Sequence, residues 1–307
     1  MLTRIHALHA VEFGAAIIDG LTRQSINTGT EVNNITTGAD VYARHQSVVA
    51  QNPGASFESL AIAKVLSSVG LNGLDLSTAA LGCYAKKRKQ GGTIEGSGQH
   101  RKYVFATGLA YLNTLSVEHQ QDAAITVEAM GTSAGVNNPL AITDGASLPT
   151  ILDEERFTLG PVTVAGVDIG DHLQSVEINF GVTVEAIGAG STIWPSHASV
   201  RTVLPEITLR GVDLEWIKDA NVPLLGKAGT HANTTIGLRK RATGGTFADD
   251  TSAAHILFTC NGLVTPESAM EASDTDEATA TIILRARHDG TNLPIIISTG
   301  VALDGGE

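Results

Sequence analysis

The sequence predicts a mainly β protein made of two tandem β-sandwich or barrel domains, each with about one α-helix. One stretch of about sixty residues occurs twice, and apolar and polar residues alternate in several segments. Alternation with a period of two is typical of strands with one packed face. The 33 glycines and the charged fraction of only 17% fit turn-rich β structure and exclude disorder. The repeat places the domains at residues 1–150 and 151–307, as the length of 307 residues favours.

The repeat runs from Lys86 to Ile142 and again from Arg239 to Ile297, and the two starts are 153 residues apart (239 − 86 = 153). Each copy opens on a basic run followed by Gly-Gly-Thr. Later landmarks keep their order and nearly their spacing, namely His100 and His255, Gly108-Leu109 and Gly262-Leu263, Asp122-Ala123 and Glu277-Ala278, and Pro139 and Pro294. Such self-similarity indicates a duplicated structural unit.

The upstream part of the repeat is aligned less clearly. Leu71 matches Ile207 at a separation of 136 residues (207 − 71 = 136). This alignment predicts about seventeen extra residues in the second copy, in a loop between Leu214 and His231.

The clearest helix is predicted at 56–69, because apolar residues there recur at helical spacing between Ser56, a capping residue, and Gly70. The matching segment of the second copy, at 196–203, is shorter and is followed by Pro205. Residues 1–30 predict an N-terminal arm with short strands. Residues 30–40 are rich in Asn, Thr and Gly and predict a loop.

Strands are predicted where alternation is regular. Residues 176–185 place five apolar side chains on one face and polar ones on the other, which predicts a strand with one wet side. Residues 124–129 and 279–284 alternate in the same way in the two copies. Each copy then closes on a short apolar run, at 139–142 and 294–297.

Composition narrows the function. A net charge of −12 argues against a protein that reads nucleic-acid sequence, since such proteins cluster Lys and Arg. Two cysteines, Cys83 and Cys260, form no disulfide framework and suit a reducing cytoplasm. The N-terminus lacks the apolar run of a signal peptide, and no apolar stretch is long enough to span a bilayer.

Catalytic and metal motifs are weak. Gly131-Thr-Ser133-Ala-Gly135 matches the pattern of a hydrolase nucleophile elbow, but a turn and a strand follow it, and the second copy lacks it. His6 and His9 have no cysteine or carboxylate companions for a metal. Because His100 and His255 recur, we expect a shared structural role for them, such as a hydrogen bond. No cofactor and no enzymatic activity are predicted.

The two basic runs are the most suggestive polar feature. They comprise Lys86, Lys87, Arg88 and Lys89 in the first copy, and Arg239, Lys240 and Arg241 in the second. A single run would be a solvated hairpin tip, whereas recurrence beside Gly-Gly favours a shared contact. Carboxylates of another subunit are the expected partners, around Asp274, Asp276 and Glu277 or around Asp153, Glu154 and Glu155.

This organisation resembles the tail tube proteins of long-tailed bacteriophages over most of the chain, although that family has no sharp motif. The resemblance implies stacked rings, in which inner strands of neighbouring subunits form one continuous barrel around a lumen. A duplicated chain would form a pseudo-hexameric ring from three copies. The implied partners are further copies, a tape-measure protein and, transiently, genomic DNA in the lumen, with no membrane. The implied location is the virion tail, assembled in the host cytoplasm.

The resemblance also assigns roles to residues. Either Glu177, Asn179, Thr183 and Glu185, or Thr126 and Glu128, face the lumen, where an acidic surface repels DNA phosphates. The basic runs lie in loops that reach the next ring. Two alternatives stay open: another virion component, such as a tail terminator, tail tip or capsid-decorating protein, and a small hydrolase that uses Ser133.

Overall fold

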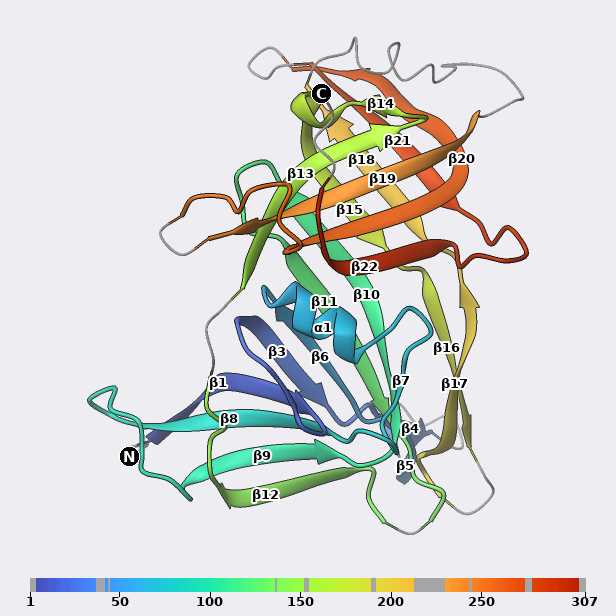
Figure 1. Ribbon diagram of the computed structural model, residues 1–307. Coiled ribbons are helices and arrows are strands. Elements are labelled where there is room, and N and C mark those ends of the chain that lie inside the picture. The colour runs from blue at the N-terminus through green and yellow to red at the C-terminus, as the bar shows by residue number, and fades with distance from the viewer. Residues whose placement is uncertain are drawn as a thin grey trace.

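The computed structural model of the chain describes residues 4–36, 42–43, 45–135, 137–151, 155–188, 192–212, 230–242, 245–273 and 278–303. Over these residues the fold is mainly β, as predicted, with large antiparallel sheets and one α-helix (Figure 1). The helix α1 (Ile62–Ser68) lies in the middle of the molecule and contacts strands of both halves of the chain (Figure 1).

The strands of the first half form two layers. One layer has the order β12-β9-β8-β1-β2 and the other β10-β11-β6-β3. The layers meet where Phe13 of β1 contacts Phe57 of β6, with 6.0 Å between ring centroids. The bounds are β1 (Arg4–Phe13), β2 (Ala16–Ile18), β3 (Leu21–Asn27), β6 (Gly54–Ser59), β7 (Leu74–Asp75, beside β10), β8 (Leu81–Lys89), β9 (His100–Phe105), β10 (Gly108–Glu118), β11 (Ala124–Gly131) and β12 (Leu140–Ala146).

The strands of the second half pair in the same way. The long strand β20 takes the places of both β9 and β10, because its first part pairs with β19 and β22 and its last part with β21. The bounds are β13 (Arg156–Val164), β14 (Val167–Asp168), the 3-10 helix η1 (Gly170–His172), β15 (Leu173–Asn179), β18 (Glu206–Gly211), β19 (Thr230–Arg241), β20 (His255–Glu271), β21 (Thr279–Ala286) and β22 (Ile295–Val301).

Strand pairs of the first half have counterparts in the second half, and register shifts recur at matching positions. The register of β9 with β12 skips one residue at Gly145, and the register of β20 with β22 skips one at Gly300, with φ of 80° and 68°. Glycine recurs at Gly108 and Gly262 because no side chain fits there. An added Cβ would lie 2.0 Å from a carbonyl oxygen of the facing strand at Gly108 and 2.2 Å from one at Gly262. The division into two domains stays a prediction, because one hydrophobic cluster runs through both halves.

The upstream alignment at a separation of 136 residues is wrong. β6 and β18 both pair with the late strand of their half, in the same register, and they are 152 residues apart (206 − 54 = 152). From Ser59 to Lys87 is 28 residues, and from Gly211 to Lys240 is 29, so the predicted seventeen-residue insertion is absent. At this separation the counterpart of α1 falls at 214–220, outside the described residues.

Three predicted elements change. The helix begins at Ile62 and not at Ser56, because residues 54–59 form β6 between β3 and β11. Residues 30–35 of the predicted loop form β4 (Thr30–Ile35), which pairs with β5 (His45–Gln51). Residues 196–203, predicted as the counterpart of the helix, instead form part of the strand β17 (Pro195–Val203), which pairs with β16 (Val182–Gly188).

Two long hairpins leave the sheet as arms. β3 continues into β4 and β5 returns into β6, while β15 continues into β16 and β17 returns into β18. Each hairpin bends at a glycine with positive φ, Gly29 at 53° and Gly181 at 58°. Each glycine carbonyl accepts the N–H of the residue before a proline, Asn52 at 3.0 Å and Leu204 at 3.1 Å. The predicted single strand at 176–185 is therefore broken at its centre.

One junction joins the two halves into a single sheet. β15 of the second half pairs antiparallel with β10 of the first, from Glu118 with Ser175 to Thr114 with Asn179. Over the described residues, the result is a 13-stranded sheet, which continues beyond β20 into β19, β13 and β14. We call its part in the order β20-β21-β18-β15-β10-β11-β6-β3 the shared sheet (Figure 1). Its inner face is apolar and covered along the central strands, with Val127, Leu115 and Ile178 at 0% exposure.

Candidate functional site

The opposite face of the shared sheet is polar and accessible, and we call it the wet face. Cross-strand register places Glu128 beside Tyr111, Thr126 beside Thr114, and Thr114 beside Asn179. Glu177 lies beside Ser116 on the same face and is exposed. The structure thus brings the predicted residues Glu177, Asn179, Thr126 and Glu128 together on one face.

Glu128 is the best-supported carboxylate of this face. Its oxygens accept hydrogen bonds from the Tyr111 hydroxyl at 2.7 Å and from Asn113 Nδ2 at 2.8 Å. Burial, and then the hydrogen bond to the Glu128 carboxylate, raise the pKa of Tyr111 well above its usual range. Tyr111 therefore stays a neutral donor, and the Glu128 carboxylate is held by two side chains of the neighbouring strand β10.

The other two predicted residues of this group lie elsewhere. Thr183 and Glu185 belong to β16, in the arm beyond the bend at Gly181, and not to the shared sheet. Glu185 forms an ion pair with Arg201 of β17 across the arm. The prediction that all four residues of 177–185 share one surface is wrong, because the glycine turn ends the strand between Asn179 and Thr183.

The wet face has an acidic excess. Its charged residues are Glu58, Glu118, Glu128, Glu177 and Glu206 against Arg23, Arg210 and Arg285. Arg285 and Glu206 pair at 3.1 Å across β21 and β18. The remaining carboxylates give the face a negative potential, which repels phosphates.

The basic runs lie at the ends of strands β8 and β19, and the loop placement predicted for them is wrong. The turn that follows is the same in both halves. Lys89 N–H donates to Thr93 at 2.9 Å, and Ala242 N–H donates to Thr246 at 2.6 Å. The register of β8 with β1 continues to Lys89, which keeps the run inside the sheet.

The second run is neutralised within the chain. Arg239 makes a two-pronged contact with Asp250 at 2.7 and 2.6 Å, and Lys240 Nζ lies 2.6 Å from Glu155. Arg241 Nε lies 3.1 Å from Asp122, a residue of the first half. Glu155 therefore serves its own chain, and the other predicted carboxylate partners, 153, 154, 274, 276 and 277, lie outside the described residues.

The first run is less engaged. Within the described residues, Lys89 pairs only with Glu95, at 3.7 Å, and Lys86 and Lys87 have no carboxylate within 4.0 Å. Lys86, Lys87 and Arg88 are half-exposed. Of the residues in the two basic runs, these three have the side chains best placed for a contact with another chain.

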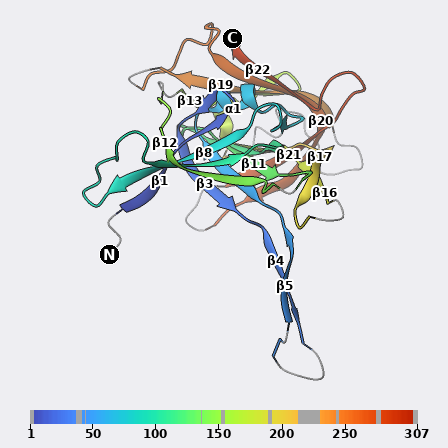
Figure 2. The same ribbon diagram turned by 90° about the horizontal axis from the view of Figure 1, so that it is seen from below.

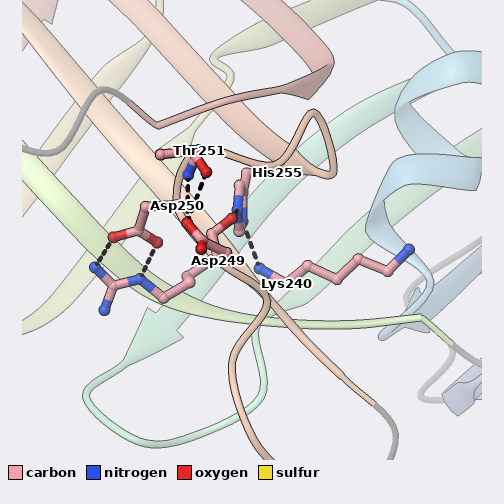
Figure 3. Close-up of polar contacts among 6 residues, drawn as sticks. Lys240, Asp249, Asp250, Thr251 and His255 are labelled. Carbon is pink, nitrogen blue, oxygen red and sulfur yellow. Dashed lines mark hydrogen bonds and ion pairs between the residues drawn. The ribbon is translucent and has the colours of Figure 1, made fainter.

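The recurrent histidines support the basic strands, as predicted. His100 Nδ1 accepts Lys87 N–H and His255 Nδ1 accepts Lys240 N–H, both at 3.0 Å. His255 Nε2 also contacts the Asp249 carbonyl at 2.8 Å, so the ring joins strand and turn (Figure 3). The side chain of Asp249 accepts from Thr251, which fixes the turn and lowers the pKa of Asp249 (Figure 3).

We expect His255→Ala to lower the free energy of unfolding by about 3 kcal/mol, because it removes a fully buried imidazole and the two hydrogen bonds by which it joins the Lys240 N–H to the Asp249 carbonyl. Thermal unfolding measures the loss. His197→Ala, at an exposed position of β17, is the matched control and should change stability little. Equal stability of both variants would contradict the role given to His255.

The hydrolase-like motif at Ser133 and the histidine pair at the N-terminus lie in surroundings that do not match a catalytic or metal site. Ser133 Oγ accepts the Gly135 N–H at 3.4 Å in a turn between β11 and β12, so no helix follows it as a nucleophile elbow requires. His9 Nε2 contacts the Pro149 carbonyl at 3.0 Å. The described part of the chain contains no cluster of three metal-ligating side chains. It also contains no helix long and apolar enough to cross a membrane.

The shared sheet ends in two open edges. At one end, β3 pairs with β6 only. At the other, residues 265–271 of β20 pair, among the described strands, with β21 only, since β19 begins at Thr230, opposite Val264 of β20. No other described strand pairs with either edge. The sequence patterns predict neither the edges nor the arms, although residues 30–59 and 182–211 match at a separation of 152, for example at His45 and His197.

No protein-family model matches the chain, and no curated protein matches it.

Proposed function

We propose that the chain is a structural subunit that joins edge to edge into closed rings, and that the rings stack into a hollow tube like the tail tube of a long-tailed bacteriophage. The observation that carries the proposal is the junction of β10 with β15. The strands left open at the two ends of the shared sheet are the counterparts of the two strands that this junction joins.

The counterparts follow from the registers. β3 and β15 are 152 residues apart (179 − 27 = 152). β3 pairs with β6, and β15 pairs with β18, the counterpart of β6. Residues 265–271 of β20 correspond to the end of β10, since both strands carry a bulge after the same position, Leu112 and Pro266, and β20 carries a second one between Ser268 and Glu271. A second copy would therefore place its β3 against residues 268–271 of the first, as β15 lies against β10.

An edge of this kind needs protection before assembly. Exposed sheet edges promote uncontrolled pairing unless polar or charged side chains interrupt them. A second register shift in β20 places Glu271 opposite Thr279, as Ser116 lies opposite Ala124. The exposed Glu271 therefore takes the place of Ser116 at the junction, and Gln24 takes the place of the buried Val176. The open edges are thus more polar than the junction, which suits a contact made by subunits that are already folded.

If the same junction repeats between copies, the wet faces of all copies form one continuous surface of the ring. We place this surface on the inside of the ring. An inner barrel of this kind has no open edges. Glu177, Asn179, Thr126 and Glu128 then line the lumen, and the acidic excess lets DNA pass without binding. Three copies would supply six halves per ring. The basic run at Lys86–Lys89 is left for a contact with the next ring, and the wider partners are a tape-measure protein and transient DNA.

Electron microscopy of the purified protein over a concentration series tests the proposal. Hollow tubes or stacked rings with three-fold class averages are expected. Monomers at every concentration and with every initiator would overturn the proposal. Single closed rings that never stack would favour the terminator, tip or decorating role.

Charge reversal separates the two basic runs. We expect Lys86→Glu with Lys87→Glu to leave thermal stability unchanged and to stop growth at single rings, because these residues lack partners in the described chain. Arg239→Glu with Lys240→Glu should instead lower stability, because it breaks contacts with Asp250 and Glu155. Normal tubes from the first variant would remove the ring-to-ring contact from the proposal.

A further inference from the structure

The two arms are counterparts of one another. The arm of β4 and β5 and the arm of β16 and β17 share one register, each with a bulge after the second pair. The register shift lies between Glu31 and Val32 in one arm and between Thr183 and Val184 in the other, 152 residues apart. At this separation Tyr42 corresponds to Trp194, and Ala43 to Pro195.

The second arm is docked on the first half of its own chain. Ser133 N–H donates to the Pro195 carbonyl at 2.8 Å, and the Trp194 indole N–H donates to the Gly135 carbonyl at 3.3 Å. Val200 of β17 lies beside Gly73, where an added Cβ would be 3.6 Å from its methyl. The arm is thereby seated on a turn formed by residues 133–135.

Among the described residues, the first arm has no matching seat at its far end, and its base is tied to its own chain where Gln51 N–H donates to the Ile193 carbonyl at 2.6 Å. The arm projects away from the body of the molecule (Figure 2). Every residue of β4 is exposed, and Tyr42 is 81% exposed. Its apolar cross-strand pair, Val32 and Val48, is 52% and 45% exposed, whereas the counterparts Val184 and Val200 are half-buried. Exposed apolar side chains that gather on one surface are typical of a site where another protein binds.

A matching seat exists in the second half. Gly290 N–H donates to His288 Nδ1 at 2.9 Å, as Gly135 N–H donates to Ser133 Oγ. Arg287 N–H donates to the Asn261 carbonyl at 3.0 Å, as Thr132 N–H donates to Thr107 at 3.1 Å. The turn at 288–290 is therefore preformed like the turn at 133–135, and its residues are exposed.

We propose that the arm of β4 and β5 docks on the turn at 288–290 of a second copy, with Tyr42 in the place of Trp194 and the Ala43 carbonyl facing His288 N–H. This inference rests on the proposed ring, because the same step that repeats the junction brings arm and turn together. The arm then spans the seam between copies, and each copy is held at two places. The partner is a second copy of this chain.

The test uses Ala43→Cys with His288→Cys in the full chain and a short bismaleimide crosslinker. Crosslinking between chains is expected in assembled protein and not in monomer. Ala43→Cys with Ser133→Cys is the matched control, because the chain's own arm already covers that turn. Tyr42→Ala should raise the protein concentration at half-assembly roughly tenfold, and Tyr42→Trp should keep the parent value. Thermal stability of the monomer should not change.

The outcomes separate the two proposals. Rings that form with the same half-assembly concentration in Tyr42→Ala, and without a 43–288 crosslink, would overturn the docking of the arm and leave the ring intact. Monomers under all conditions would overturn the ring and the docking together. A 43–288 crosslink between chains, weakened assembly by Tyr42→Ala and retained assembly by Tyr42→Trp would establish the docking.

Discussion

Asn27→Cys combined with Ser268→Cys is expected to link copies of the chain covalently, with closed trimers as the largest product. The pair is the counterpart of Asn179 and Thr114, which face each other at the junction. Directly opposite residues of antiparallel strands have Cα atoms about 4.5–5.5 Å apart, within the range that a disulfide bridges. Oxidation and denaturing electrophoresis give the ladder of products, and its upper limit counts the copies in a ring.

Two control variants make this experiment specific. Thr114→Cys with Asn179→Cys should close within one chain and give no ladder. Asn27→Cys with Thr265→Cys moves one partner three residues along β20, about 10 Å at 3.4 Å per residue, and should not link. The native thiols do not interfere, since burial raises the pKa of Cys83 and of Cys260 to about 12. A ladder from the shifted pair and none from Asn27 with Ser268 would contradict the register.

The sequence predicted the parts of the fold that rest on local signals. Residues 124–129 and 279–284 alternate strictly and form β11 and β21. The recurrence of the basic run with His100 and His255 reflects one conserved hydrogen bond in each half. In these places local pattern and tertiary pairing agree.

The parts that failed depend on contacts distant in sequence. Alternation at 176–185 continues past Gly181, but a glycine at positive φ bends the backbone there without changing the apolar pattern. A capping residue before an apolar run predicts a helix that begins at Ser56, whereas pairing with β11 makes residues 54–59 a strand. The wet face could be predicted strand by strand, but not the junction that joins β10 to β15 or the edges that it leaves open.

Gly181→Ala should be among the most damaging single substitutions in the chain. An added Cβ would lie 2.0 Å from the Leu204 carbonyl oxygen, and φ is 58°, a conformation that costs an alanine about 1–2 kcal/mol. Relief of the clash must move the backbone where Gly181 accepts the Leu204 N–H and where the docked arm begins. We expect a loss of about 3 kcal/mol, which is roughly 5–10 °C in thermal midpoint.

Gly29→Ala makes the same local change, with a Cβ 2.1 Å from the Asn52 carbonyl oxygen, but it precedes the arm that projects freely. Within the described residues that arm is tied to its own chain at its base, by the Gln51 N–H bond to the Ile193 carbonyl, whereas every residue of β4 beyond the bend is exposed, so the bend can relax at small cost in the monomer. Gly29→Ala should therefore preserve the thermal midpoint and weaken assembly, whereas Gly181→Ala should lower the midpoint itself. Gly188→Ala, where an added Cβ meets nothing within 4 Å, is the control for both. Equal effects of Gly29→Ala and Gly181→Ala on the monomer would show that the bends act only locally, without regard to what each arm contacts.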